Sequence, residues 1–171
     1  TNYHLPSLDA ANAPATISAK AITISGLTSS DKIYDGTTNA TVAGTASLQS
    51  AISVGTGSTS DGKPYDVDSV SITGTAVGTF NDKDVSDATT VAFSGLSLTG
   101  TGSGNYSLSN HADASHTISV KPVTVSGLTS SDKTYDGTTN ATVAGTASLQ
   151  SAISAGTGSA SDGKPYDVDS L

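Results

Sequence analysis

Residues Lys20 to Leu48 read KAITISGLTSSDKIYDGTTNATVAGTASL, and this stretch indicates the fold class. Apolar and polar residues alternate at its start, which places Ile22 and Ile24 on one face of a predicted strand. The segment YDGTTN supplies the Asp, Gly and Asn residues that are typical of a tight turn. A second alternating segment follows the turn. The stretch therefore predicts strands joined by a turn.

The same stretch returns 101 residues later, with Lys121 in the place of Lys20. Residues 20–69 and 121–170 differ at six of fifty positions, and the loops are as alike as the predicted strands. A period this long exceeds the roughly 20–50 residues of solenoid repeats and indicates an array of domains. The predicted parts are the tail of a preceding repeat at 1–19, a complete repeat at 20–120 and the first half of a following repeat at 121–171.

The composition favours strands and turns. All fifteen acidic residues are Asp, all seven basic residues are Lys, and the chain is rich in Ser, Thr and Gly. One segment, TASLQSAIS at 45–53, is also compatible with a short helix. Short strands with turns between them predict an all-β fold of Ig-like β-sandwich modules, with a β-grasp-like small sheet domain as the alternative. The other predicted strands are 40–48, 51–54, 69–76, 89–93, 96–99, 106–109 and 117–120.

The net charge of −8 argues against nucleic acid as a partner, because such binding needs a basic stripe. No hydrophobic run approaches the roughly 20 residues of a membrane helix, so membrane insertion is not expected. The chain has no Cys, and disulfides therefore play no part in its stability.

The apolar face changes where one predicted repeat meets the next. Before the junction the apolar residues Ile17 and Ala19 stand at odd-numbered positions, whereas after it Ile22 and Ile24 stand at even-numbered positions. In a strand, odd and even positions face opposite sides of the sheet. We expect the last strand of each repeat to run on, after a residue or two, as the first strand of the next. Pro122 stands at this break in the second copy and stiffens it.

Two groups of aspartates are candidate calcium ligands, because calcium prefers clustered oxygen ligands. Neither group fits an EF-hand loop, since Glu is absent from the chain. Asp66 and Asp68 are predicted to share one face of a strand. Solvated loop acids are the alternative explanation, so no metal or other cofactor is assigned. The candidates are Asp82, Asp84 and Asp87 in NDKDVSD, and Asp61, Asp66 and Asp68 in DGKPYDVDS.

The YDG sequence is predicted to be a structural motif. Gly36 is expected to take positive φ, and the Asp35 carboxylate to accept from the amide of Thr37 or Thr38. Tyr34 is expected to anchor the turn at the edge of the core, with its hydroxyl tied to a nearby carbonyl. A ligand site made of Tyr and Asp is the functional alternative. The motif comprises Tyr34, Asp35 and Gly36 in one copy and Tyr135, Asp136 and Gly137 in the other.

Further motifs follow the opening stretch in order: GTAVGTFNDKDV, VAFSGLSLTGTGSGNYSL and HTISVK. Together they resemble the YDG domain, a tandem repeat of large bacterial extracellular proteins, many of them filamentous-haemagglutinin-like adhesins exported by two-partner secretion. The middle segment SAISVGTGSTSDGKPYDVDSVS is longer than the family pattern. The resemblance implies a stalk or adhesin repeat of a bacterial cell-surface or secreted protein. It does not imply an enzyme or a known ligand.

We therefore expect a non-catalytic stalk or spacer repeat of an adhesin, biofilm component or extracellular filament, whose partners are neighbouring repeats. The alternative is a repeat whose loops bind a glycan, an exopolysaccharide or a neighbouring fibre. The half-repeat 121–171 is expected to have its open sheet edge covered by another element, such as the 1–19 tail of a second copy added as a strand.

Overall fold

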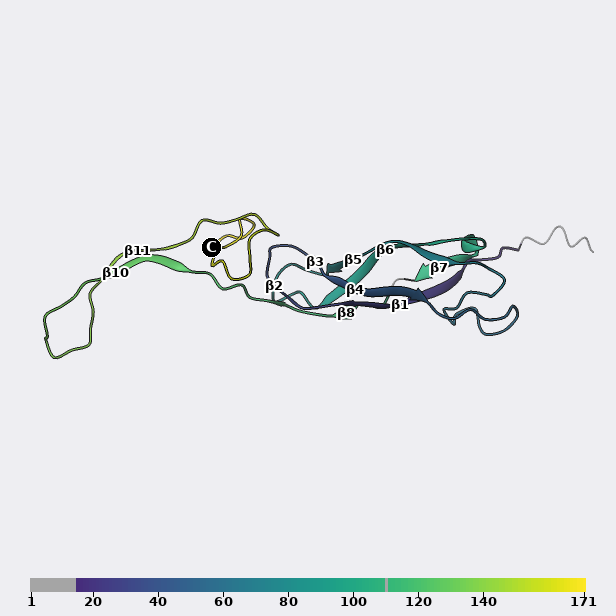
Figure 1. Ribbon diagram of the computed structural model, residues 1–171, viewed down its shortest axis with the longest axis horizontal. Helices are drawn as coiled ribbons and strands as arrows, with labels where there is room; N and C mark the ends of the chain where they lie inside the picture. The colour runs from purple at the N-terminus through teal and green to yellow at the C-terminus, as the bar shows by residue number, and fades with distance from the viewer. Residues whose placement is uncertain (1–14, 110) are drawn as a thin grey trace, which may run out of the picture. The chain divides into compact units, whose positions relative to one another are not determined.

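The computed structural model describes residues 15–109 and 111–171, which form strands connected by turns (Figure 1). Within these ranges there is no α-helix, and the all-β prediction is confirmed. Among the described residues, the 3₁₀ turn η2 spans Ser103–Asn105. The strands are β1 Lys20–Ser29, β2 Lys32–Ile33, β3 Asn39–Ala40, β4 Val42–Leu48, β5 Ser71–Phe80, β6 Thr90–Thr99, β7 Tyr106–Ser109, β8 Ala114–Ser115, β9 Ile118–Ser119, β10 Val125–Ser130 and β11 Val143–Leu149.

These strands of the described residues form four sheets, with the orders β4-β1-β7, β3-β5-β6-β8, β2-β9 and β10-β11. Among the described residues, some strand pairings are parallel. β7 lies along β1 with Tyr106 opposite Lys20, and β9 lies along β2 with Ile118 opposite Lys32. Strands near the end of the repeat thus pair with strands near its beginning. This agrees with the long connection that parallel neighbours need. The described part of the chain has no helix long and apolar enough to cross a membrane.

Several predicted boundaries differ from the structure. The separate strands predicted at 89–93 and 96–99 form the single strand β6, because a glycine between them takes positive φ and carries the strand through a kink. Residues 45–48 lie in β4, and residues 45–53 form no helix. The predicted strand at 51–54 is reduced to an isolated bridge at Ile52.

The prediction that the last strand of one repeat runs on, after a residue or two, as the first strand of the next is wrong. Residues 120–124 are not in a strand, and neither are residues 15–19 before β1. Pro122 has no amide hydrogen to donate to a ladder, which explains the break in the second copy. Before the first copy, residues 15–19 are all exposed, Ile17 among them, so no buried contact holds these five residues in a sheet. The rest of the predicted tail, 1–14, lies outside the described residues.

A pair of facing glycines shapes the first sheet. In β1 the buried residues are Ile22, Ile24 and Leu27, so the spacing changes from two to three. The change occurs at Gly26, whose φ is +88°. Opposite it, a Cβ added at Gly44 would overlap the carbonyl oxygen of Gly26. The two strands therefore approach each other more closely than any residue other than glycine allows.

The described chain divides into two compact units. One consists of residues 15–24, 47–73 and 97–109, and its buried apolar residues are Ile22, Ile24 and Tyr106. The other consists of residues 25–46, 74–96 and 111–171, and its buried apolar residues are Leu27, Phe80, Ala88, Val91, Phe93, Ile118 and Tyr166.

The strands β10 and β11 of the second copy pair antiparallel, with a register shift between Ser126 and Leu128. Every residue in both strands is exposed. Leu128 is 53% exposed, whereas its counterpart Leu27 is 5% exposed. Local sequence is therefore enough to specify the pairing of β10 with β11, but the side chains of the two strands stay exposed. Coverage of this pair by a second copy stays a prediction.

Candidate functional site

The YDG turn of the complete repeat has the predicted geometry. Gly36 has a φ of +76°, and Asp35 Oδ1 accepts a hydrogen bond of 2.9 Å from the amide of Thr37. Lys32 Nζ donates to Asp35 Oδ1 and to the Thr37 carbonyl, each at 2.7 Å. Burial alone would raise the pKa of Asp35, but the hydrogen bonds from Lys32 and Thr37 outweigh it and lower that pKa. The turn is thus held by its own polar groups.

The second copy repeats this turn. Gly137 has a φ of +78°, and Asp136 Oδ1 accepts from the amide of Thr138 at 2.9 Å. Lys133 Nζ lies 2.8 Å from the same oxygen, and this contact with Lys133 is the main cause that lowers the pKa of Asp136. Because residues 131–140 around this turn are all exposed, the turn needs only local sequence to form.

The Tyr34 hydroxyl does not bind a nearby carbonyl as predicted. It donates a hydrogen bond of 2.6 Å to Asp169 Oδ1, 135 residues further along the chain. The ring of Tyr34 also meets the ring of Tyr166 edge to face, with centroids 5.8 Å apart. Burial, and then the Asp169 carboxylate, raise the pKa of Tyr34 to about 12. Tyr34 is therefore held by residues of the following copy.

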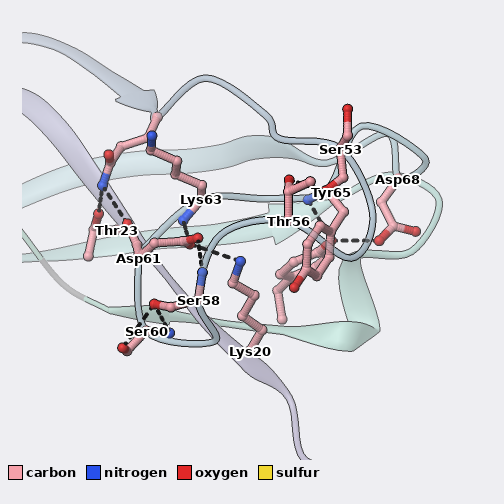
Figure 2. A network of polar contacts seen from close by, with 12 residues as sticks. Lys20, Thr23, Ser53, Thr56, Ser58, Ser60, Asp61, Lys63, Tyr65 and Asp68 are labelled. Carbon is pink, nitrogen blue, oxygen red and sulfur yellow. Dashed lines mark hydrogen bonds and ion pairs between the residues drawn. The ribbon is translucent and has the colours of Figure 1, made fainter.

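A second polar cluster lies in the complete repeat, where the long 49–68 segment meets the start of β1 (Figure 2). Lys20 Nζ lies 2.8 Å from Asp61 Oδ1, as an ion pair without hydrogen-bond alignment, and 4.2 Å from the centre of the Tyr65 ring. The Lys20 side chain is 8% exposed. Beside it, the Tyr106 hydroxyl donates to Asp68 Oδ2 at 2.6 Å and accepts from the Tyr65 amide at 2.9 Å. We call these five residues the lysine cluster.

Asp61 also organises its own loop. Its two carboxylate oxygens accept from the amides of Ser58 at 3.0 Å and Lys63 at 2.9 Å. The contact with Lys20, followed by these amides, lowers the pKa of Asp61 to about 2. The carboxylate therefore stays ionised and ties the loop to the first strand.

The centre of the lysine cluster recurs in the second copy. Lys121 Nζ lies 2.9 Å from Asp162 Oδ1 and 4.0 Å from the centre of the Tyr166 ring. The contact with Lys121 is the main cause that lowers the pKa of Asp162 to about 2. Sequence reasoning missed both ion pairs. Their partners are about forty residues apart, and no periodicity connects them.

The calcium candidates of the long loop have separate roles. Asp61 pairs with Lys20, Asp66 Oδ2 accepts from the Ser53 hydroxyl at 3.1 Å, and Asp68 accepts from Tyr106. The prediction that Asp66 and Asp68 share a strand face is wrong, because residues 66–68 form a turn after the isolated bridge at Tyr65.

The candidates of the NDKDVSD loop are likewise engaged locally. Asp82 Oδ1 accepts from the Asp84 amide at 2.9 Å, Asp84 pairs with Lys83 at 2.6 Å, and Asp87 accepts from Ser86 at 3.1 Å. Across residues 15–109 and 111–171, no three His, Cys, Asp or Glu side chains are grouped to hold a metal. Calcium binding stays a prediction, which thermal unfolding with calcium and then with a chelator would test.

The ion pairs of Asp61 and Asp162 predict acid sensitivity. Their folded-state pKa values of about 2 lie below the usual value of about 3.9, so their contribution is complete above the latter. It is lost as the pH falls from about 4 to about 2. Urea unfolding of the chain should show stability falling through this window. The double variant Asp61→Asn, Asp162→Asn should show a flatter dependence, whereas the exposed control Asp132→Asn should match the original chain. Equal slopes for all three proteins would contradict this role of the ion pairs.

Comparison with protein families gives one match, to the YDG domain, at residues 18–115 and again at 119–164. The two matches begin close to the two lysines that open the copies and together span most of the chain. No curated protein matches the chain, and no solved structure matches it. On the family match, the chain belongs to the YDG domain family.

Proposed function

We propose that the chain is a segment of a stalk in a bacterial surface or secreted adhesin, or in an extracellular filament, in which YDG modules of β-sandwich type follow one another in tandem. The recurrence of the first half of the repeat, loops included, carries this proposal. Packing alone tolerates many core sequences, so near-identity in the loops exceeds what the fold requires. Duplication with selection on the number of modules accounts for it, because the length of a spacer depends on that number.

The lysine cluster supports a mechanical role. Its Lys and Asp side chains neutralise each other beside a tyrosine ring, and the arrangement recurs at Lys121 with nearly the same distances. The cluster ties a long loop to the first strand without a disulfide, since the chain has no Cys. The net charge of −8 favours repulsion between neighbouring molecules. These are useful properties for a spacer outside the cell.

The proposed mechanism is spacing without catalysis, and the proposed partners are adjacent modules. Titration of the chain against host glycans and bacterial exopolysaccharides tests it. A spacer shows no saturable binding. Saturable binding that is lost in Tyr135→Ala would instead make the repeat a binding module, because Tyr135 is a 91% exposed aromatic residue able to stack on a sugar.

A further inference from the structure

We propose that the tyrosine of the YDG motif is the residue with which each repeat binds the next repeat of the same chain. The inference deepens the proposed function and rests on it, because it names the partner of the motif within a tandem array. The partner surface is the loop of the following copy that contains Tyr166 and Asp169.

The contact around Tyr34 combines charge and aromatic packing. Its hydroxyl donates to a carboxylate, a stronger bond than one between neutral groups, at 2.6 Å from Asp169. Lys83 of the complete repeat lies 3.8 Å from the same carboxylate oxygen and 5.9 Å from the centre of the Tyr34 ring. Tyr166, which belongs to the following copy, packs its ring against the ring of Tyr34. All four residues belong to the second compact unit.

The backbone of the YDG turn contacts the same loop. The amide of Gly156 donates to the carbonyl of Asp35 at 2.7 Å. A Cβ added at Gly36 would lie 2.8 Å from the Cβ of Ala155, so glycine is required here for close approach as well as for its positive φ. Side chains of both copies, including Tyr34, Lys83, Tyr166 and Val168, line a cavity of about 540 Å³. The Tyr, Asp and Gly of the motif thus all touch the following copy.

The chain contains its own comparison for this contact. Tyr135, the counterpart of Tyr34, is 91% exposed, whereas Tyr34 is partly buried. Tyr166 is 3% exposed, whereas its counterpart Tyr65 is only partly buried. The sequences around each pair are nearly identical. The presence of the neighbouring copy, and not the local sequence, therefore accounts for the added burial.

The carboxylate at this repeat position accepts from a tyrosine in both copies. Asp68 accepts from Tyr106 of its own repeat, and Asp169 accepts from Tyr34 of the preceding one. A carboxylate has two oxygens, so one Asp is able to accept from both tyrosines. In a longer array, each such Asp would link the end of its own repeat to the motif of the repeat before it.

Amide hydrogen exchange of the 171-residue chain, followed by NMR, tests the contact. The probe is Gly156, with its counterpart Gly55 as reference, whose amide has no backbone acceptor among the described residues. Gly156 should exchange about tenfold more slowly than Gly55, the size expected for one added hydrogen bond in a packed contact. Tyr34→Ala should bring Gly156 to the rate of Gly55, Tyr34→Phe should have a smaller effect, and Tyr135→Ala should leave Gly156 unchanged.

Equal rates for Gly156 and Gly55 in the original chain would overturn the inference, as would an unchanged Gly156 rate in Tyr34→Ala. If Tyr34→Ala also speeds exchange of the β1 amides, the complete repeat has itself lost stability. Asp169→Ala is then the deciding variant, because it removes the acceptor on the following copy and leaves Tyr34 in place. Faster exchange at Gly156 with β1 still protected supports the inference, and an unchanged rate overturns it. Failure here would leave the spacer function intact, whereas failure of the spacer function would appear as saturable glycan binding.

Discussion

Phe80→Ala is expected to lower the free energy of unfolding of the complete repeat by about 3–5 kcal/mol. The Phe80 ring is 2% exposed at the end of β5, and its amide donates to the Thr38 carbonyl beneath the YDG turn at 2.7 Å. Lys32 Nζ, which holds that turn, lies 5.5 Å from the centre of the Phe80 ring. Truncation of the Phe80 side chain therefore removes packing from the core and also removes the ring that lies near Lys32, the residue that holds the YDG turn.

Urea unfolding followed by circular dichroism measures this loss. The matched control is Val77→Ala in the same strand, where the side chain is 49% exposed and the expected cost is below about 1 kcal/mol. An equal loss of stability in the two variants would contradict the assignment of Phe80 to the core.

Gly44→Ala is expected to cost about 2–5 kcal/mol, which makes it the second large effect. The left-handed backbone at φ +84° adds roughly 1–2 kcal/mol for any residue with a Cβ. The overlap of that Cβ with the carbonyl oxygen of Gly26 adds about 1–3 kcal/mol more, because two paired strands must move apart.

Two other glycines separate these causes in the same unfolding assay. Gly55 has positive φ but open space around it, so Gly55→Ala should show the backbone cost alone. Gly104 has open space and no positive φ, so Gly104→Ala should be close to neutral. The expected order of destabilisation is Gly44, Gly55, Gly104. A Gly44 variant no less stable than the Gly55 variant would show that the close strand approach has little energetic weight.

Local features of the fold were predictable from the sequence. The turn at Asp35 and Gly36 involves residues two apart, and its side-chain and backbone preferences are intrinsic to those residue types. The alternation at Ile22 and Ile24 correctly indicates a strand with one buried face. The exposed turn of the second copy, with the same hydrogen bonds, shows why such features can be read from a short stretch.

Contacts between distant residues were not predictable in the same way. A chain with seven Lys and fifteen Asp residues allows many Lys–Asp pairings. Nothing in the sequence distinguishes the Lys20–Asp61 ion pair from the others. The Tyr34–Asp169 bond joins two copies, and a pattern within one copy holds no information about it. The aspartates grouped in sequence as calcium candidates have separate partners in space, because turn residues point in different directions.

We propose that YDG modules act as additive spacers, a claim that predicts a constant gain in length for each added module. Small-angle X-ray scattering of chains extended by one, two and three further 101-residue repeats measures this gain. The ten-residue strands of the complete repeat each span roughly 34 Å, so the maximum dimension should rise by a constant increment of about that size or more per repeat. A maximum dimension that grows only as the cube root of mass, as for a single compact particle, would contradict the claim.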